Sequence, residues 1–250
     1  DTHDSPDIPD KSRFGWFAKH IRKSKPDIVV QIGDFVTLDS CTHYIRDDSY
    51  TAKIEKPIFM KDMESMDSAM EEFNYHLKDF KIKKYLTLGN HEKRMFRKED
   101  SNPTFYGMCQ KEFFGNCKKY DWQVIPYGKY LMLGGVGFIH APINPMGKEY
   151  GGEASERQVA NKSKIDIVFG HSHRAQDNRV AKISPIPNDF TRIINVGCAM
   201  PHNHIESYAK HSLTGWTYQV CELTIWDNHI HEVNNISMET LEREYGRKKH

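Results

Sequence analysis

Five short polar motifs hold the side chains of this 250-residue chain that could do chemistry. In chain order they are Asp1-Thr2-His3, Gly33-Asp34, Gly89-Asn90-His91-Glu92, His140 and Gly170-His171-Ser172-His173. Together the motifs offer carboxylates, imidazoles and a neutral amide oxygen, which are ligand types that two adjacent divalent ions need. One histidine is left over, and a histidine can move a proton because its pKa lies near neutrality. The motifs therefore predict a site for two metal ions.

The segments that precede these motifs have the character of buried β-strands. Short apolar runs cover residues 27–32, 84–88 and 165–169, and a longer one covers 130–139. Each of these runs ends where a motif begins, and ligand sites in α/β proteins gather beyond the carboxyl ends of strands. A further strand is expected over residues 122–125. We therefore expect strand ends to position the motifs.

Helices are expected between the strands. Apolar residues at helical spacing predict helices over residues 10–25, 58–80, 105–114 and 153–161. The second of these carries an apolar stripe that is typical of a core face and consists of Met63, Met66, Met70, Phe73 and Leu77.

The remaining segments complete the expected organisation. The tail over residues 191–233 has the pattern of a β-meander, with an antiparallel pair at 216–225 and 229–233. Residues 38–57 are polar and rich in turn formers, and we interpret them as an insertion over the site. Because no repeat or obvious linker divides the chain, we expect one domain over residues 1–250.

The composition is that of an ordinary globular protein, with 38% apolar and 28% charged residues. A net charge of +1 neither requires nor excludes a nucleic-acid partner, since a local basic patch can coexist with overall neutrality. Five cysteines without a CxxC pair suit a reducing compartment, so we expect a cytoplasmic protein. No apolar stretch approaches the roughly 20 residues that span a bilayer, so no membrane partner is expected. The chain opens on Asp1 rather than Met, so we expect upstream residues, and a removed signal peptide stays open.

The order and residue types of the five motifs resemble the calcineurin-like metallophosphoesterase superfamily. The resemblance implies an α/β fold in which two mixed β-sheets pack as a sandwich with helices on the outer faces, a four-layer αββα arrangement. It also implies a phosphoester hydrolase in which two metal ions activate a water molecule for in-line attack on phosphorus.

The resemblance distributes seven side chains over two divalent ions. The ligands of the first ion are Asp1, His3, Asp34 and His173. The ligands of the second ion are Asn90, His140 and His171, together with Asp34 as the bridging carboxylate. Nitrogen and oxygen ligands without a thiolate favour manganese, with iron, zinc, cobalt or nickel as alternatives.

Several of these assignments have structural alternatives. Asp1 and His3 lie at a chain end, which is normally frayed and poorly able to hold a metal ion. His140 could be a satisfied structural histidine. The histidines of Gly170-His171-Ser172-His173 could be polar loop residues. His202 and His204 lie outside the full ligand set, and we expect their loop to face either substrate or solvent.

His91 is expected to act on the substrate without binding metal. By resemblance it stabilises the phosphate or protonates the leaving oxygen. Its neighbour Glu92 either orients the His91 ring through a ring nitrogen or is a plain surface carboxylate.

The substrate is less sharply predicted than the reaction. The Arg-Gly that follows the GD motif in protein Ser/Thr phosphatases is missing after Gly33-Asp34, which argues against that branch. The basic run at residues 93–98 could track a nucleic-acid backbone or form a solvated helix face. We expect a phosphodiesterase or nuclease, with Arg94 and Arg174 as substrate ligands and DNA or a nucleotide as partner. A nucleotide or small-molecule phosphomonoesterase is the alternative, and a non-catalytic scaffold of the same fold is the alternative of another class.

Overall fold

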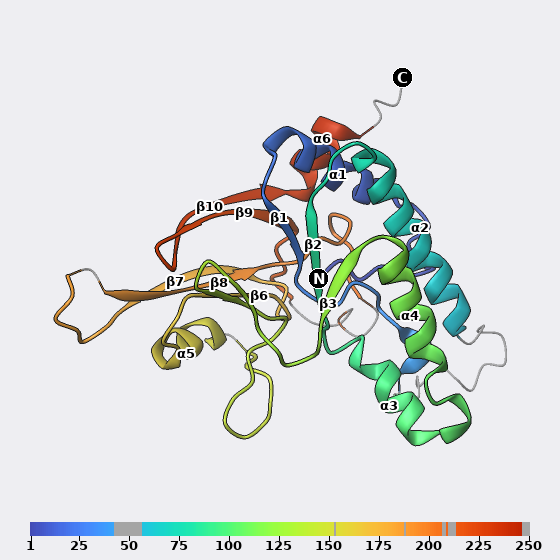
Figure 1. Ribbon diagram of the computed structural model, residues 1–250, viewed down its shortest axis with the longest axis horizontal. Helices are drawn as coiled ribbons and strands as arrows, with labels where there is room; N and C mark the ends of the chain where they lie inside the picture. Colours follow the sequence, from blue (N-terminus) through green and yellow to red (C-terminus); the bar gives the residue numbers. More distant parts are fainter. Residues whose placement is uncertain (43–56, 153, 188, 207–208, 210–213, 247–250) are drawn as a thin grey trace.

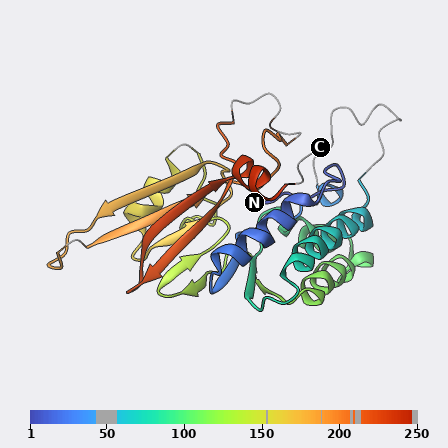
Figure 2. The ribbon, with the colours of Figure 1, turned by 90° about the horizontal axis from the view of Figure 1, so that it is seen from above.

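Two β-sheets pack face to face in the computed structural model, and helices cover their outer faces (Figures 1 and 2). The structure describes the chain apart from residues 43–56, 153, 188, 207–208, 210–213 and 247–250. Val30 and Ile32 from one sheet meet Val168 and Ile194 from the other in a shared apolar core. The expected α/β fold of packed sheets with outer helices is therefore confirmed.

The first sheet has three parallel strands in the order β1-β2-β3. Their bounds are β1 (Ile28–Gln31), β2 (Lys83–Thr87) and β3 (Trp122–Ile125). All three were expected from their apolar runs, because short buried strands leave a strong local signal.

Helices cover the outer face of this sheet. They are α1 (Ser12–Ser24), α2 (Phe59–Leu77), α3 (Lys93–Ser101) and α4 (Met108–Lys119), and Figure 2 shows them along one side of the molecule. The apolar stripe of α2 lies in the core, with each of its five members at most 5% exposed. That prediction is confirmed.

The second sheet is mixed and has the strand order β4-β5-β6-β8-β7. Its strands are β4 (Leu131–Leu133), β5 (Val136–Phe138), β6 (Ile167–Phe169), β7 (Ala175–Ala181) and β8 (Phe190–Val196). The inner three run parallel, whereas β4 and β7 at the edges pair antiparallel with their neighbours. Helix α5 (Ser155–Lys162) packs Val159 and Ala160 against the outer face of this sheet.

A two-stranded ribbon of β9 (Gln219–Trp226) and β10 (His229–Ser237) adds Ile230 to the core between the sheets. It is the antiparallel pair expected for the tail. Helix α6 (Met238–Tyr245) follows, and the side chain of Ser237 caps it by accepting from the backbone N–H of Thr240.

Several segments differ from the expectation. The tail does not form one meander, because β8 pairs with β6 and β7 in the second sheet, whereas β9 and β10 form the separate ribbon. The run over 130–139 is a hairpin of two strands, because Gly134 and Gly135 adopt φ of 55° and 81° and turn the chain. The helix expected from residue 105 begins at Met108, after Gly107 at φ 80°. The expected insertion over 38–57 falls mostly on 43–56, outside the described residues, so it stays a prediction.

Candidate metal centre

The N-terminal motif lies near the middle of the molecule, beside the loop that follows β1 (Figures 1 and 2). Residues 1–4 run along that loop: His3 N donates to Asp34 O at 2.9 Å, and Asp4 N donates to Phe35 O at 2.7 Å. Asp1 itself is 4% exposed. The segment is thus held by backbone hydrogen bonds on both sides of His3, which answers the concern that these residues fray.

Buried charges tie the same segment to α1 and α2. Arg13 Nη2 lies 3.2 Å from Thr2 O and 3.1 Å from Asp4 Oδ1. Lys11 Nζ and Ser65 Oγ also donate to the Asp4 carboxylate, at 2.8 and 2.7 Å. Burial raises the pKa of Asp4, and the two cations oppose that rise. The helices therefore fix the strand-like segment that carries Asp1 and His3.

Four side chains converge where the first ion is expected. His3 Nε2 lies 3.0 Å from His173 Nε2 and 3.7 Å from Asp34 Oδ2. Asp1 Oδ1 lies 4.0 Å from His3 Nε2 and 3.8 Å from His173 Nε2. Among the described residues, no hydrogen-bond donor reaches this buried Asp1 oxygen. An unpaired carboxylate oxygen facing two ring nitrogens fits a cation.

The second group shares Asp34 with the first. His140 Nε2 lies 3.2 Å from Asp34 Oδ2 and 2.9 Å from Asn90 Oδ1. His171 Nδ1 lies 2.9 Å from the same Asn90 oxygen. His140 Nδ1 lies 3.0 Å from Ile32 O, so its proton belongs there and Nε2 is free to bind metal. The structure thus brings together all seven predicted ligands.

The spacing and protonation of both groups fit metal ions. Two atoms about 2.1 Å from a shared ion lie roughly 3.0 to 3.4 Å apart, close to several of these separations. Burial lowers the pKa of His171 to about 4 and of His173 to about 3, so both rings are neutral, which is the ligating form. Burial opposes ionisation of Asp34, but His140 and His91 hold its pKa well below the usual range.

His91 lies beside the ligand groups with a fixed tautomer. Its Nδ1 donates to Thr37 O at 2.7 Å, and Arg94 Nη2 lies 3.1 Å from its Nε2. Because a guanidinium can only donate, Nε2 is the unprotonated nitrogen in this arrangement. Burial lowers the pKa of His91. The charge of Asp34 opposes this decrease, and the charge of Arg94 lowers the pKa further. The Nε2 atom lies 3.9 Å from Asp34 Oδ2 and faces the site.

Glu92 is buried at 0% exposure and holds backbone rather than the His91 ring. One carboxylate oxygen accepts from the N–H groups of Asp34 and Gly89, at 3.0 and 2.8 Å. The other accepts from Phe35 and Val36, at 2.7 and 3.2 Å. Both expectations for Glu92 are wrong, because Thr37 O lies at the His91 ring nitrogen and the Glu92 carboxylate is buried rather than on the surface. Burial raises the pKa of Glu92, whereas its four amide donors favour the ionised form.

A second buried glutamate supports the loop that carries His171 and His173. Asn195 Nδ2, from β8, lies 2.7 Å from Ser172 Oγ, 3.2 Å from Gly170 O and 2.8 Å from Glu156 Oε1. Glu156, from α5, is 0% exposed. The sequence analysis did not identify either residue, because neither lies in a motif. Only the register of β6 against β8 brings Asn195 to this loop.

Four ligands have left-handed backbone conformations, with φ between 44° and 71°. They are His3, Asp34, His171 and His173. Left-handed conformations are costly for residues other than glycine and persist where the surrounding structure enforces them. Gly33, at φ 99°, passes so close to His140 that an added Cβ would lie 2.6 Å from Nδ1. The loops are therefore bent tightly to aim the ligands.

The two arginines expected to bind substrate, Arg94 and Arg174, lie next to residues of the predicted site. Arg94 is partly buried at the start of α3, with Nη1 2.9 Å from Thr37 O and 3.6 Å from Asp39 Oδ1. Arg174 follows His173 directly and is half-buried. Their contact with substrate stays a prediction.

The loop over residues 201–206 brings an unexpected carboxylate to the site. His202 Nε2 pairs with Glu239 Oε1 at 3.0 Å, and His204 Nε2 lies 3.9 Å from Glu206 Oε1. Glu206 is 7% exposed, and the same oxygen lies 3.4 Å from His3 Nδ1. Burial, followed by the charge of Asp39, raises the pKa of Glu206 to about 7. No sequence signal links this loop to the N-terminal motif.

Comparison with known proteins agrees with this geometry. The family model for calcineurin-like phosphoesterases matches residues 1–175, which include every predicted ligand. Members of this family are in general metal-dependent phosphoester hydrolases. A search of curated proteins found no match. None of the described helices combines the length and apolar character that crossing a bilayer requires. The chain belongs to the calcineurin-like phosphoesterase family.

Proposed function

We propose that the chain is a binuclear phosphodiesterase that acts on nucleic acid. One observation carries the binuclear part: Asp34 Oδ2 lies 3.7 Å from His3 Nε2 in one ligand group and 3.2 Å from His140 Nε2 in the other. A single carboxylate is thus placed to serve two ions. Manganese suits the mixed nitrogen and oxygen ligands, with iron, zinc, cobalt or nickel as alternatives.

Two bound ions would supply a nucleophilic hydroxide at neutral pH and would offset charge on the phosphoryl oxygens. The chain's own contribution begins with His91. Its Nδ1–H is anchored on Thr37 O and its Nε2 is unprotonated, so Nε2 would first take the proton released by the attacking water and would then pass it to the leaving oxygen. Arg94 Nη2 donates to that same Nε2, so protonation of His91 must break this hydrogen bond. The Nη2 group would then be free to donate to a non-bridging phosphate oxygen.

The preference for nucleic acid is supported by the first turns of α3. Lys93, Arg94, Arg97 and Lys98 follow His91 within seven residues, and Arg97 is exposed. Lys93 Nζ lies 4.3 Å from the centre of the Tyr127 ring. Cations beside aromatic rings suit a phosphodiester backbone with its bases.

The five cysteines are free thiols, which supports a cytoplasmic location.

The test compares hydrolysis of bis-p-nitrophenyl phosphate and p-nitrophenyl phosphate in the presence of Mn²⁺. We expect turnover of the diester, reduced by about 10²- to 10³-fold or more in Asp34→Asn. The matched control is Asp100→Asn, which changes an exposed carboxylate on α3 and should keep the wild-type rate. Single- and double-stranded DNA are the next substrates.

Other outcomes select the alternatives. Turnover of the monoester alone would indicate a nucleotide or small-molecule phosphomonoesterase. Two bound ions without turnover of either ester or of DNA would indicate a scaffold of the same fold. Equal rates in Asp34→Asn and the wild type would contradict the binuclear mechanism.

A further inference from the structure

We propose that Glu206 is the positioning residue for His3 at the first metal ion. This inference rests on the proposed function, since it takes His3 as a ligand. Glu206 lies outside residues 1–175, so the family match does not cover it. It belongs to the loop that follows β8 and reaches the N-terminal motif only in the folded chain.

The His3 ring is fully buried, and its two nitrogens have different surroundings. Nε2 faces Asp1, Asp34 and His173, the groups of the first ion. When Nε2 binds metal, Nδ1 must carry the ring proton. Within the described part of the chain, Nδ1 makes no hydrogen bond of good geometry, and a carboxylate oxygen of Glu206 lies 3.4 Å away. A small movement of either side chain would complete that bond.

The neighbouring histidines each have a backbone acceptor at Nδ1, which His3 lacks. His140 Nδ1 lies 3.0 Å from Ile32 O, and His91 Nδ1 lies 2.7 Å from Thr37 O. Backbone carbonyls thus fix the tautomers of these two rings. For His3 the corresponding acceptor is a carboxylate, and a carboxylate behind a metal-bound imidazole both orients the ring and makes it more basic.

The loop that carries Glu206 is itself anchored. Tyr218 Oη donates to His204 O at 2.5 Å, and His202 pairs with Glu239 of α6 at 3.0 Å. The carbonyl of Glu206 accepts from the N–H of Ala209 at 2.9 Å. The carboxylate is therefore presented to His3 from a loop fixed against β9 and α6, which suits a positioning role.

The test is a titration of metal-free protein with Mn²⁺, with stoichiometry from calorimetry and the site environment from electron paramagnetic resonance. In Glu206→Ala we expect one of two ions to bind about 10- to 100-fold more weakly, with the other unchanged. Glu206→Gln keeps an oxygen acceptor and should recover most of the affinity. Glu242→Ala removes an exposed carboxylate on α6 that has no part in anchoring this loop, and should bind both ions as the wild type does.

A double-mutant cycle identifies which ion is affected. His3→Ala and Glu206→Ala should weaken the same ion, and the double variant should be no weaker than His3→Ala alone. Wild-type affinities for both ions in Glu206→Ala would overturn the inference, as would equal losses in Glu242→Ala. Two ions bound to the wild type without hydrolysis would contradict the proposed function alone, because the titration decides the role of Glu206 without turnover.

Discussion

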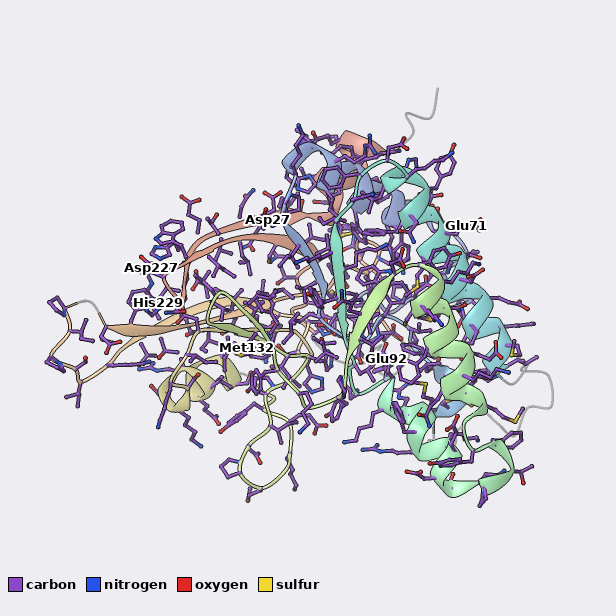
Figure 3. All side chains as sticks on the ribbon, in the orientation of Figure 1. Asp27, Glu71, Glu92, Met132, Asp227 and His229 are labelled. Carbon is purple, nitrogen blue, oxygen red and sulfur yellow. The ribbon has the colours of Figure 1, made fainter. Side chains whose placement is uncertain are left out.

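Two halves of the metal centre are supported in different ways. In the half built on the first sheet, the loops after β1 and β2 are joined by Glu92, whose carboxylate accepts four backbone N–H groups. In the half built on the second sheet, the loop after β6 is held by Asn195 and Glu156 through side-chain contacts. Glu92, labelled in Figure 3, is buried, whereas the labelled Asp27 and Glu71 are exposed.

The two glutamates differ in the hydrogen-bond donors from which their carboxylates accept. Glu92 binds the backbone of two loops that both carry ligands, so its loss would leave four amide donors without their acceptor. Glu156 Oε1 accepts from two side chains, Asn195 Nδ2 at 2.8 Å and Ser172 Oγ at 3.4 Å, and its Oε2 has no partner among the described residues. The same residue type therefore carries a large share of loop stability in one half and a small share in the other.

Glu92→Ala should produce the largest effect on folding. Each buried N–H that loses its acceptor costs about 1–3 kcal/mol, so four of them should lower the free energy of unfolding by about 4 kcal/mol or more. Urea unfolding of the metal-free protein, followed by circular dichroism, measures this. Glu64→Ala, at an exposed position of α2, is the control and should change stability by under about 0.5 kcal/mol. A loss below about 1 kcal/mol in Glu92→Ala would contradict the role we assign to its carboxylate.

Glu156→Ala should cost less, about 1–2 kcal/mol, because only two side-chain donors lose this acceptor and Asn195 Nδ2 keeps Gly170 O as a partner. Glu156→Gln keeps the oxygen that accepts from Asn195 and should lie closer to the wild type. The same unfolding experiment ranks both variants against Glu92→Ala. If Glu156→Ala proved as costly as Glu92→Ala, the contrast between the two halves would be lost.

Left-handed backbone at predicted ligands occurs in both halves, and it predicts the smallest effect on stability. His171 has φ 71°, so Ala at this position keeps the left-handed strain and Gly relieves it. We expect His171→Gly to be more stable than His171→Ala by about 1 kcal/mol in the metal-free protein. At the exposed helical residue Glu71 the order should reverse, with Ala above Gly by about 1 kcal/mol. Thermal unfolding of the four variants measures these differences in stability. If Ala were more stable than Gly at both positions, the His171 backbone would be unstrained.

The parts of the molecule that were predictable are those with local causes. The strands β1, β2 and β6 were expected within two residues at each end, because a buried apolar run followed by a glycine motif is a signal within one segment. The hairpin of β4 and β5 was missed, although Gly134 and Gly135 lie in its turn, because the apolar residues on both sides suggested one continuous strand.

The support of the site was beyond the sequence for a different reason. Glu92 was recognised, but three of its four partners are amides 56–58 residues earlier in the chain, and backbone groups leave no sequence signal. Asn195 and Glu206 reach the site through the pairing of β8 and the course of the loop after it. Motifs therefore predicted a set of side chains that lie together, whereas tertiary packing determined which residues hold them in place.

The predicted ligands of each proposed ion come from both sheets, since Asp34 and His173 belong to opposite halves of the sandwich, as do Asn90 and His140. An ion bound in either group would therefore hold the two sheets together as well as take part in the reaction. Any free energy that the ions add to the cohesion of the sheets must be matched by an equal gain in metal affinity from the packed core, because linkage is reciprocal. A substitution that loosens the core at Ile194 or Ile230, both distant in sequence from every predicted ligand, should thus weaken metal binding.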